Sequence, residues 1–224
     1  MRIEAAELRP FRLRLRTPLA TAMGPLAFRE GVLLSLRNAD GRVGYGEATP
    51  LPAFGTETLD AARRSLEACA ASLEGADPGE PADLLGWIDR RCPPTSTARA
   101  AIDCALHDLV AREAGQSMAS WLAAKQGGSA RPTVTVSALL VSGSPGALAS
   151  EAQRAVEGGF RTLKLKVGAG PVSGDLERVA AVRGAVGPAT RIRVDANGGW
   201  SPDQARDRLE GLARFDLEFV EQPV

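Results

Sequence analysis

The chain has 224 residues, 44% hydrophobic and 24% charged, which is the ordinary balance of a globular protein with a packed core. Its 27 basic and 27 acidic side chains cancel, which argues against a surface for nucleic acid or for anionic membranes. No apolar run approaches the roughly 18 residues that a membrane span needs. The first residues are charged throughout, so we predict a cytoplasmic protein without a signal peptide.

The first part of the chain predicts a sheet followed by helices. Phe11, Leu13 and Leu15 alternate with arginines, as in a half-buried strand, and GVLLSLRN and RVGYGEA predict two further strands joined by a turn. Apolar residues then recur at spacings of three and four, which predicts a helix capped by Thr56. Further helices are predicted up to Gly127-Gly128, where we place a domain boundary.

After that boundary, strands alternate with helices. TVTVSALL, RTLKLKV, RIRVD and LEFVE predict four strands, and helices of about 10 to 15 residues separate them. This alternation is typical of right-handed βαβ units and a parallel sheet, so the fold class is α/β. The four strands of residues 129–224 fit either a doubly wound sheet or half of a (β/α)₈ barrel.

Cysteine and histidine offer little catalytic chemistry. Cys69, Cys92 and Cys104 match no zinc spacing, and their odd number predicts reduced thiols. Cys69 and Cys104 fall in alanine-rich helical stretches, where we interpret them as buried small hydrophobic residues. His107 is the only histidine and lies within a predicted helix, so we interpret it as a packing or surface residue rather than a triad member.

Lysine is rare, and its placement is informative. Of 27 basic residues only three are lysines, and two of them, Lys164 and Lys166, lie two positions apart on the strand RTLKLKV. Arginine stays protonated in proteins, whereas lysine can lose its proton. Both faces of a parallel sheet are normally covered, and a buried ammonium group needs a partner. The pair therefore predicts functional lysines, the alternative being a chance placement of interchangeable surface charges.

Carboxylates end the next two strands. Asp195 ends RIRVD and Glu221 ends LEFVE, and barrel enzymes build their active sites at this end of the strands. Carboxylate oxygens suit Mg²⁺, and a lysine with a lowered pKa beside the metal can serve as a base. Taken singly, Asp195 is equally a turn or cap residue and Glu221 a surface residue. The ordered set predicts a magnesium site.

KLKVG, VDANGGW and VEQP, in this order on successive strands, resemble the muconate-lactonizing subgroup of the enolase superfamily. The resemblance covers essentially the whole chain, because its first part is similar to that family's capping domain. It implies an α+β capping domain over residues 1–128. It also implies the first half, about four βα units, of a (β/α) barrel over residues 129–224.

The resemblance also implies roles for the site residues. Asp195 and Glu221 would hold Mg²⁺, and Lys164 and Lys166 would flank a small-molecule carboxylate substrate. Lys166 matches the family's usual acid/base, and Lys164 would tune its pKa. The metal would stabilise an enediolate that forms when a proton leaves the carbon next to the carboxylate.

The substrate is predicted from the capping-domain loops. TPLATAMGPLAFREGVLL, GYGEATPLPAFGTETL and TVSALL resemble o-succinylbenzoate synthase, so our main hypothesis is the magnesium-dependent lyase of menaquinone biosynthesis. The alternative within the subgroup is a dipeptide epimerase or an N-acylamino acid racemase, and muconate cycloisomerases share the core motifs. As substrate-binding residues we select Thr21, Met23, Phe54 and Asn197.

The sequence departs from the family at its end. A (β/α)₈ barrel takes about 250 residues, and the third metal carboxylate and the lysine on the opposite face of the substrate are missing. The last strand would leave an unpaired sheet edge, which we expect a missing C-terminal half or another copy of the chain to cover. We therefore expect a fragment of a longer enzyme, a truncated product without activity or, as a different class, a non-catalytic scaffold.

Overall fold

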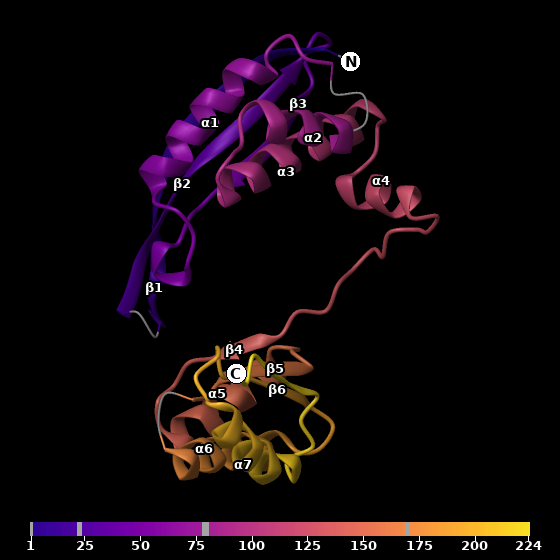
Figure 1. The fold of residues 1–224 in the computed structure, drawn as a ribbon. Coiled ribbons are helices and arrows are strands. Elements are labelled where there is room, and N and C mark those ends of the chain that lie inside the picture. Colours follow the sequence, from indigo (N-terminus) through magenta and orange to yellow (C-terminus); the bar gives the residue numbers. More distant parts are fainter. Residues whose placement is uncertain (1, 22–23, 78–80, 169–170) are drawn as a thin grey trace. The chain divides into compact units, whose positions relative to one another are not determined.

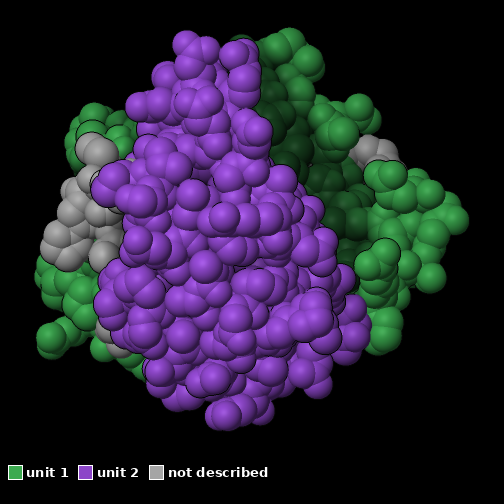
Figure 2. Space-filling model, turned by 90° about the horizontal axis from the view of Figure 1, so that it is seen from below, with its two compact units in different colours: residues 1–132 green, residues 133–224 purple. Residues whose placement is uncertain are grey.

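A computed structural model describes residues 2–21, 24–77, 81–168 and 171–224 of the chain. Contacts divide the chain into two compact units, residues 1–132 (unit 1) and residues 133–224 (unit 2), which Figure 2 colours separately. This division and the boundary expected after residue 128 both fall between the last helix of unit 1 and the first strand of unit 2. Within the described ranges, none of the helices combines the length and the apolar character that crossing a membrane demands.

Unit 1 is built on an antiparallel sheet in the order β1-β2-β3 (Figure 1). Its strands are β1 (Ile3–Thr21), β2 (Gly24–Asn38) and β3 (Val43–Ala48). Gly41, at the predicted turn between β2 and β3, has a φ of 76°, a left-handed conformation that suits glycine.

Helices cover one face of this sheet. They are α1 (Leu59–Leu73), α2 (Pro81–Arg91) and α3 (Ser96–Glu113), whereas α4 (Met118–Lys125) follows α3 and adds none of its described residues to the core. The core they share with the sheet includes Ile3 and Leu8 of β1, whereas Leu13, farther along that strand, is 60% exposed. The predicted half-buried alternation is therefore wrong at Leu13, because the helices cover only the other end of the strand.

The predicted cap of α1 is also wrong. The helix begins two residues later than expected, and Thr58 caps it by accepting a hydrogen bond from the Ala61 amide. The hydroxyl of Thr56 instead accepts a hydrogen bond from the Leu51 amide at 2.6 Å. Glu57, the next residue, lies before α1 and caps another helix.

Glu57 binds the first residues of α3. Its carboxylate accepts hydrogen bonds from the Thr97 amide at 3.0 Å, the Thr97 hydroxyl at 2.6 Å and the Ser96 hydroxyl at 2.8 Å. Partial burial alone would raise the pKa of Glu57, but hydrogen bonds from Thr97, Thr95 and Ser96 outweigh it and lower the pKa to about 2. A carboxylate at a helix N-terminus also interacts favourably with the helix dipole.

We expect Glu57→Gln to lower the free energy of unfolding by about 1–2 kcal/mol at neutral pH. Because the folded pKa of Glu57 lies below its ordinary value of 4.5, its stabilisation is complete above pH 4.5 and is lost as the pH falls toward 2. Denaturant unfolding of both proteins between these pH values measures the difference. Glu67→Gln, at an exposed residue of α1, is the control, and a difference that stays constant with pH would contradict the assignment.

Unit 2 is a parallel sheet in the order β4-β5-β6-β7, with helices between successive strands (Figure 1). The strands are β4 (Ala138–Leu140), β5 (Thr162–Lys166), β6 (Arg191–Asp195) and β7 (Phe219–Glu221). The helices are α5 (Pro145–Glu157), α6 (Val172–Val186) and α7 (Pro202–Ala213). The predicted fold class, an α+β part followed by parallel βα units, is confirmed.

The strand predicted over TVTVSALL is shorter than expected. Only Ala138–Leu140 pairs with β5, whereas Val134 and Val136 are 78% and 66% exposed. These valines alternate as in a strand. The register of β4 would pair them with residues 159 and 161, which lie before the first residue of β5. Alternation therefore predicted a strand where no neighbouring strand supplies hydrogen bonds.

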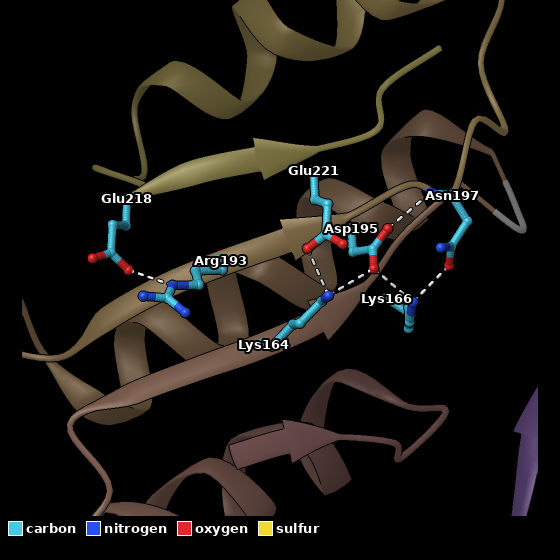
Figure 3. A network of polar contacts seen from close by, with 7 residues as sticks. All are labelled: Lys164, Lys166, Arg193, Asp195, Asn197, Glu218 and Glu221. Carbon is cyan, nitrogen blue, oxygen red and sulfur yellow. Dashed lines mark hydrogen bonds and ion pairs between the residues drawn. The ribbon is translucent and has the colours of Figure 1, made fainter. Parts of the chain in front are cut away.

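The two faces of the unit 2 sheet differ. One face packs on the helices through Leu163, Leu165, Ile192 and Val194, all fully buried. The opposite face carries the polar side chains that Figure 3 shows in front of the strands. The leucine and lysine faces of β5 are therefore separated as the sequence pattern predicted.

Arg183 of α6 binds the two loops that lead into β6 and β7, at the end of the sheet where these strands begin. Its guanidinium donates hydrogen bonds to four backbone carbonyls, those of Gly187 at 2.8 Å, Thr190 at 2.7 Å, Phe215 at 3.0 Å and Asp216 at 2.9 Å. One side chain thus satisfies carbonyls that lead into β6 and β7. The planar fork of arginine suits this task better than a single ammonium group.

We expect Arg183→Ala to destabilise unit 2 by about 2–4 kcal/mol, because several charge-assisted hydrogen bonds are lost and partly buried carbonyls are left unpaired. Arg183→Lys should recover only part of this loss. The free energy of unfolding of both variants is measured in urea, with amide hydrogen exchange in β6 as the probe of unit 2. Arg206→Ala, with a side chain 79% exposed on α7, should change little, and full stability in the lysine variant would disprove the geometric argument.

Candidate active site

The polar face of the unit 2 sheet gathers its charged side chains where the strands end. The register pairs Lys166 of β5 with Asp195 of β6, and Asp195 with Glu221 of β7. Residues in register on neighbouring parallel strands point to the same face. Lys164 lies one pleat earlier on the same face, so the four predicted residues are brought together.

Hydrogen bonds join these four side chains into one network (Figure 3). The ammonium of Lys164 lies 2.6 Å from Glu221 Oε2 and 2.8 Å from Asp195 Oδ2. The ammonium of Lys166 lies 2.6 Å from Asp195 Oδ2 and 2.6 Å from Asn197 Oδ1. The carboxylates of Asp195 and Glu221 therefore converge on the same cation rather than pointing to opposite sides of the sheet.

The surroundings shift the pKa values of two of these side chains, Asp195 and Lys164. Asp195 has a side chain only 1% exposed, and burial alone would raise its pKa, but hydrogen bonds from Lys164, Lys166 and the Asn197 amide lower it below its ordinary value. Burial alone would lower the pKa of Lys164, but its bonds to Asp195 and Glu221 raise it. A lysine with a lowered pKa was expected here. Lys164 does not meet that expectation in this arrangement, because the two carboxylates outweigh burial.

The two carboxylates are the kind of ligand that Mg²⁺ prefers, but two are fewer than the ion needs. Both offer hard oxygen ligands, and the Lys164 ammonium between them shows that a cation is accommodated at this position. No group of three or more His, Cys, Asp or Glu side chains suited to a metal lies together within the described part of the chain. A divalent cation at this position would therefore need further ligands besides Asp195 and Glu221.

Asn197, selected as a substrate-binding residue, has internal partners. Besides accepting from Lys166, it donates its backbone amide to Asp195 Oδ1 at 3.0 Å. Its φ is 49°, and Gln222, directly after β7, has a φ of 40°. The Gly198 amide donates to the Gln222 carbonyl at 2.7 Å, so the segments after β6 and β7 are tied together beside the site. Asn197 orients Lys166 and Asp195 here.

The other three substrate-binding candidates belong to unit 1. Phe54 ends the short helix η1 (Pro52–Phe54) and is 56% exposed. Thr21 is the last residue of β1, and Met23 lies outside the described residues. Their binding roles stay predictions.

A buried carboxylate beside the end of β5 was not predicted. Asp175 of α6 is 5% exposed and accepts hydrogen bonds from the Gly168 amide at 2.9 Å and from Arg208 Nη1 at 3.2 Å. Arg178 Nη1 donates to the Lys166 carbonyl at 3.0 Å. The end of β5 is thereby fixed to α6 and α7. Asp175 follows a pattern common at exposed helix starts, so its burial had no signal in the sequence.

Known proteins share this chain's sequence and fold. Residues 4–122 match the family described as mandelate racemase / muconate lactonizing enzyme, N-terminal domain, and residues 147–224 match the family described as enolase C-terminal domain-like. The hydrophobic dipeptide epimerase of Enterococcus faecalis is 31% identical over 224 residues, which cover 100% of this chain and 62% of the relative.

Two further relatives have other names. The N-succinyl-L-Arg/Lys racemase of Bacillus cereus is 28% identical, with 100% of this chain and 60% of the relative covered. Muconate cycloisomerase 1 of Pseudomonas putida is 30% identical, with 94% and 56% covered.

A solved structure agrees with the whole described fold. The crystal structure of the E. faecalis dipeptide epimerase complexed with Mg and the dipeptide L-Leu-L-Tyr has a TM-score of 0.90 and 30% identity, and the match covers 100% of this chain and 62% of that chain. The present chain thus spans about three fifths of the length of these proteins. With its antiparallel N-terminal domain and the parallel strands of a partial barrel, the chain belongs to the mandelate racemase / muconate lactonizing enzyme family of the enolase superfamily.

Proposed function

We propose that the protein carrying this chain inverts the carbon next to a carboxylate in a dipeptide or an N-acylamino acid. One observation carries the proposal: two lysines and two carboxylates from three adjacent strands meet at the strand ends in a single network. Acid/base chemistry needs an amine that can accept a proton and a positive environment for the charge that develops on the substrate. The network supplies both elements.

Each residue has a distinct role in this proposal. Lys166 removes the proton as a neutral amine, from a position beside Asp195 and Asn197 where its side chain is 48% exposed. Lys164, whose ammonium lies within 2.8 Å of Asp195 and Glu221, contributes positive charge. Asp195 and Glu221 hold Mg²⁺, which when bound would stabilise negative charge on the substrate carboxylate.

Inversion also needs a proton to return on the face of the carbon opposite Lys166. The sequence holds one further lysine, Lys125, which lies on α4 of unit 1. The family resemblance implies a lysine for that face, and the strands of unit 2 hold none besides Lys164 and Lys166. Proton exchange at the carbon requires only Lys166, so exchange and inversion are separate readouts.

The relatives bear on the choice between the two substrate hypotheses. Those described above are an epimerase, a racemase and a cycloisomerase, which favours the epimerase or racemase alternative over the o-succinylbenzoate synthase hypothesis. The solved neighbour contains Mg and a dipeptide of two large apolar residues. We therefore propose dipeptides as the first substrate class and N-acylamino acids as the second.

The test is a substrate panel for the protein that carries this chain, with Mg²⁺ and after chelation. The panel contains hydrophobic dipeptides, N-succinyl amino acids, muconate and the cyclohexadiene precursor of o-succinylbenzoate. We expect metal-dependent deuterium incorporation at the α-carbon and the highest kcat/KM with a dipeptide or an N-acylamino acid. Faster dehydration of the cyclohexadiene would restore the lyase hypothesis. A folded protein that exchanges no proton in any substrate would favour the non-catalytic scaffold.

A further inference from the structure

Two of the three cysteines contact each other in unit 1. Cys69 is fully buried on α1, and Cys92 directly follows the last residue of α2. Their sulfur atoms lie 2.8 Å apart, and the Cys69 thiol also lies 3.1 Å from the Cys92 carbonyl oxygen. This is closer than two non-bonded sulfur atoms normally approach, and only a small shift separates it from the roughly 2.05 Å of a disulfide bond.

The surrounding backbone holds the two sulfurs in place. The Cys92 amide still donates to the Ile88 carbonyl at 2.8 Å, which continues the hydrogen bonding of α2. Pro93 and Pro94 follow and restrict the backbone. The Thr95 amide then donates to the Ser65 hydroxyl at 3.0 Å, one helical turn before Cys69. Residues 92–95 are therefore fastened to α1 at two points a turn apart.

We propose that Cys69 and Cys92 form a reversible disulfide that locks α1 to the end of α2 under oxidising conditions. The inference concerns unit 1 alone and is independent of the proposed function. Cys104, an exposed residue of α3, is not part of the pair and provides an internal control. Its exposure also shows that the prediction of a buried Cys104 is wrong, whereas Cys69 is buried as predicted.

The exposures of the two thiols set the order of events. Cys92 is half-buried and meets an oxidant first, whereas burial and the contact with Cys92 raise the pKa of the Cys69 thiol to about 12. With a hydroperoxide as oxidant, the sulfur of Cys92 attacks the terminal oxygen, the O–O bond breaks and a sulfenic acid forms, while the departing alkoxide or hydroxide takes up the thiol proton of Cys92 and leaves as an alcohol or water. Cys69 sulfur then attacks Cys92 sulfur, the S–S bond forms, and the departing hydroxide leaves as water with the Cys69 proton. Two electrons pass from the thiols to the hydroperoxide.

The experiment uses the chain with Cys104→Ser, so that only the pair can react. After hydrogen peroxide or a glutathione redox buffer, we expect both thiols to disappear together in a monomer, with a mass loss of two hydrogens. Peptide mapping without reductant should show the peptides of Cys69 and Cys92 linked. Because the bond closes a loop within a stable core, the unfolding temperature of unit 1 should rise by about 5–10 °C and return after dithiothreitol.

The matched control is the double variant Cys104→Ser, Cys92→Ser. It retains buried Cys69, and we expect its thiol to survive the same treatment with no rise in unfolding temperature. The proposal is overturned if Cys92 proceeds to sulfinic acid while Cys69 keeps its thiol, if sulfurs link only between chains, or if neither peroxide nor the glutathione buffer removes the two thiols from the folded chain.

Discussion

Replacement of Lys166 by alanine is expected to lower turnover by at least about 10²–10⁴-fold, because a positioned base is lost. The side chain is 48% exposed and lies at a strand end, so the free energy of unfolding should change by less than about 1 kcal/mol. Lys166→Arg should not restore activity, since a guanidinium group does not give up its proton near neutral pH. The measurement is deuterium exchange at the substrate α-carbon together with kcat, in the protein that carries this chain.

The control separates loss of the base from loss of the site. Lys125→Ala removes the lysine of α4, which contacts the ring of Trp121, and should leave exchange unchanged. The Lys166 variants keep Asp195 and Glu221, so magnesium binding measured by calorimetry should persist. Near-native exchange in Lys166→Ala would show that another group moves the proton, and the proposed role of this lysine would have to be abandoned.

The convergence of the four side chains was predictable because strand ends can be identified in the sequence. Ser144 and Ser201, each directly before a proline, cap α5 and α7, so β5 and β6 lie between well-marked helices. Once the last residues of successive parallel strands are known, the register follows, and Lys166 and Asp195 must lie side by side. Local capping and alternation mark where each strand ends, and the parallel pairing of the strands then brings the four side chains together.

Features that depend on distant neighbours were not predictable. Asp175 looks like an ordinary acidic residue in the first turn of a helix, yet it is buried because Arg208, from another helix, reaches it. The close approach of β3 and α3 is another case. Added side-chain atoms at Gly44 and Gly46 would collide with the carbonyls of Ala105 and Ala101. Sequence alternation shows a strand there but not which helix lies against it.

The second large effect is expected for Asp195→Asn, which should weaken Mg²⁺ binding at least about 100-fold, because one of two available carboxylates loses its charge. The same change should destabilise unit 2. Asp195 is the common partner of Lys164 and Lys166, and its removal leaves two ammonium groups with only Glu221 and Asn197 as partners. Breaking a fully buried ion pair costs about 3–5 kcal/mol, and the partial exposure of both lysines reduces our expectation to about 2 kcal/mol.

The dependence of this destabilisation on pH identifies its cause. The pKa of Asp195 is lowered in the folded chain, so its stabilising contribution is complete above the ordinary pKa of an aspartate and is lost as the pH falls through the folded pKa. Urea unfolding of the two proteins, followed by the fluorescence of buried Trp200, should therefore show a gap at neutral pH that closes in acid. Asp203→Asn, with a side chain 93% exposed on α7, is the matched control and should show no gap. A gap of equal size at neutral and acid pH would mean that Asp195 acts by packing alone, and unchanged magnesium affinity would remove it from the metal site.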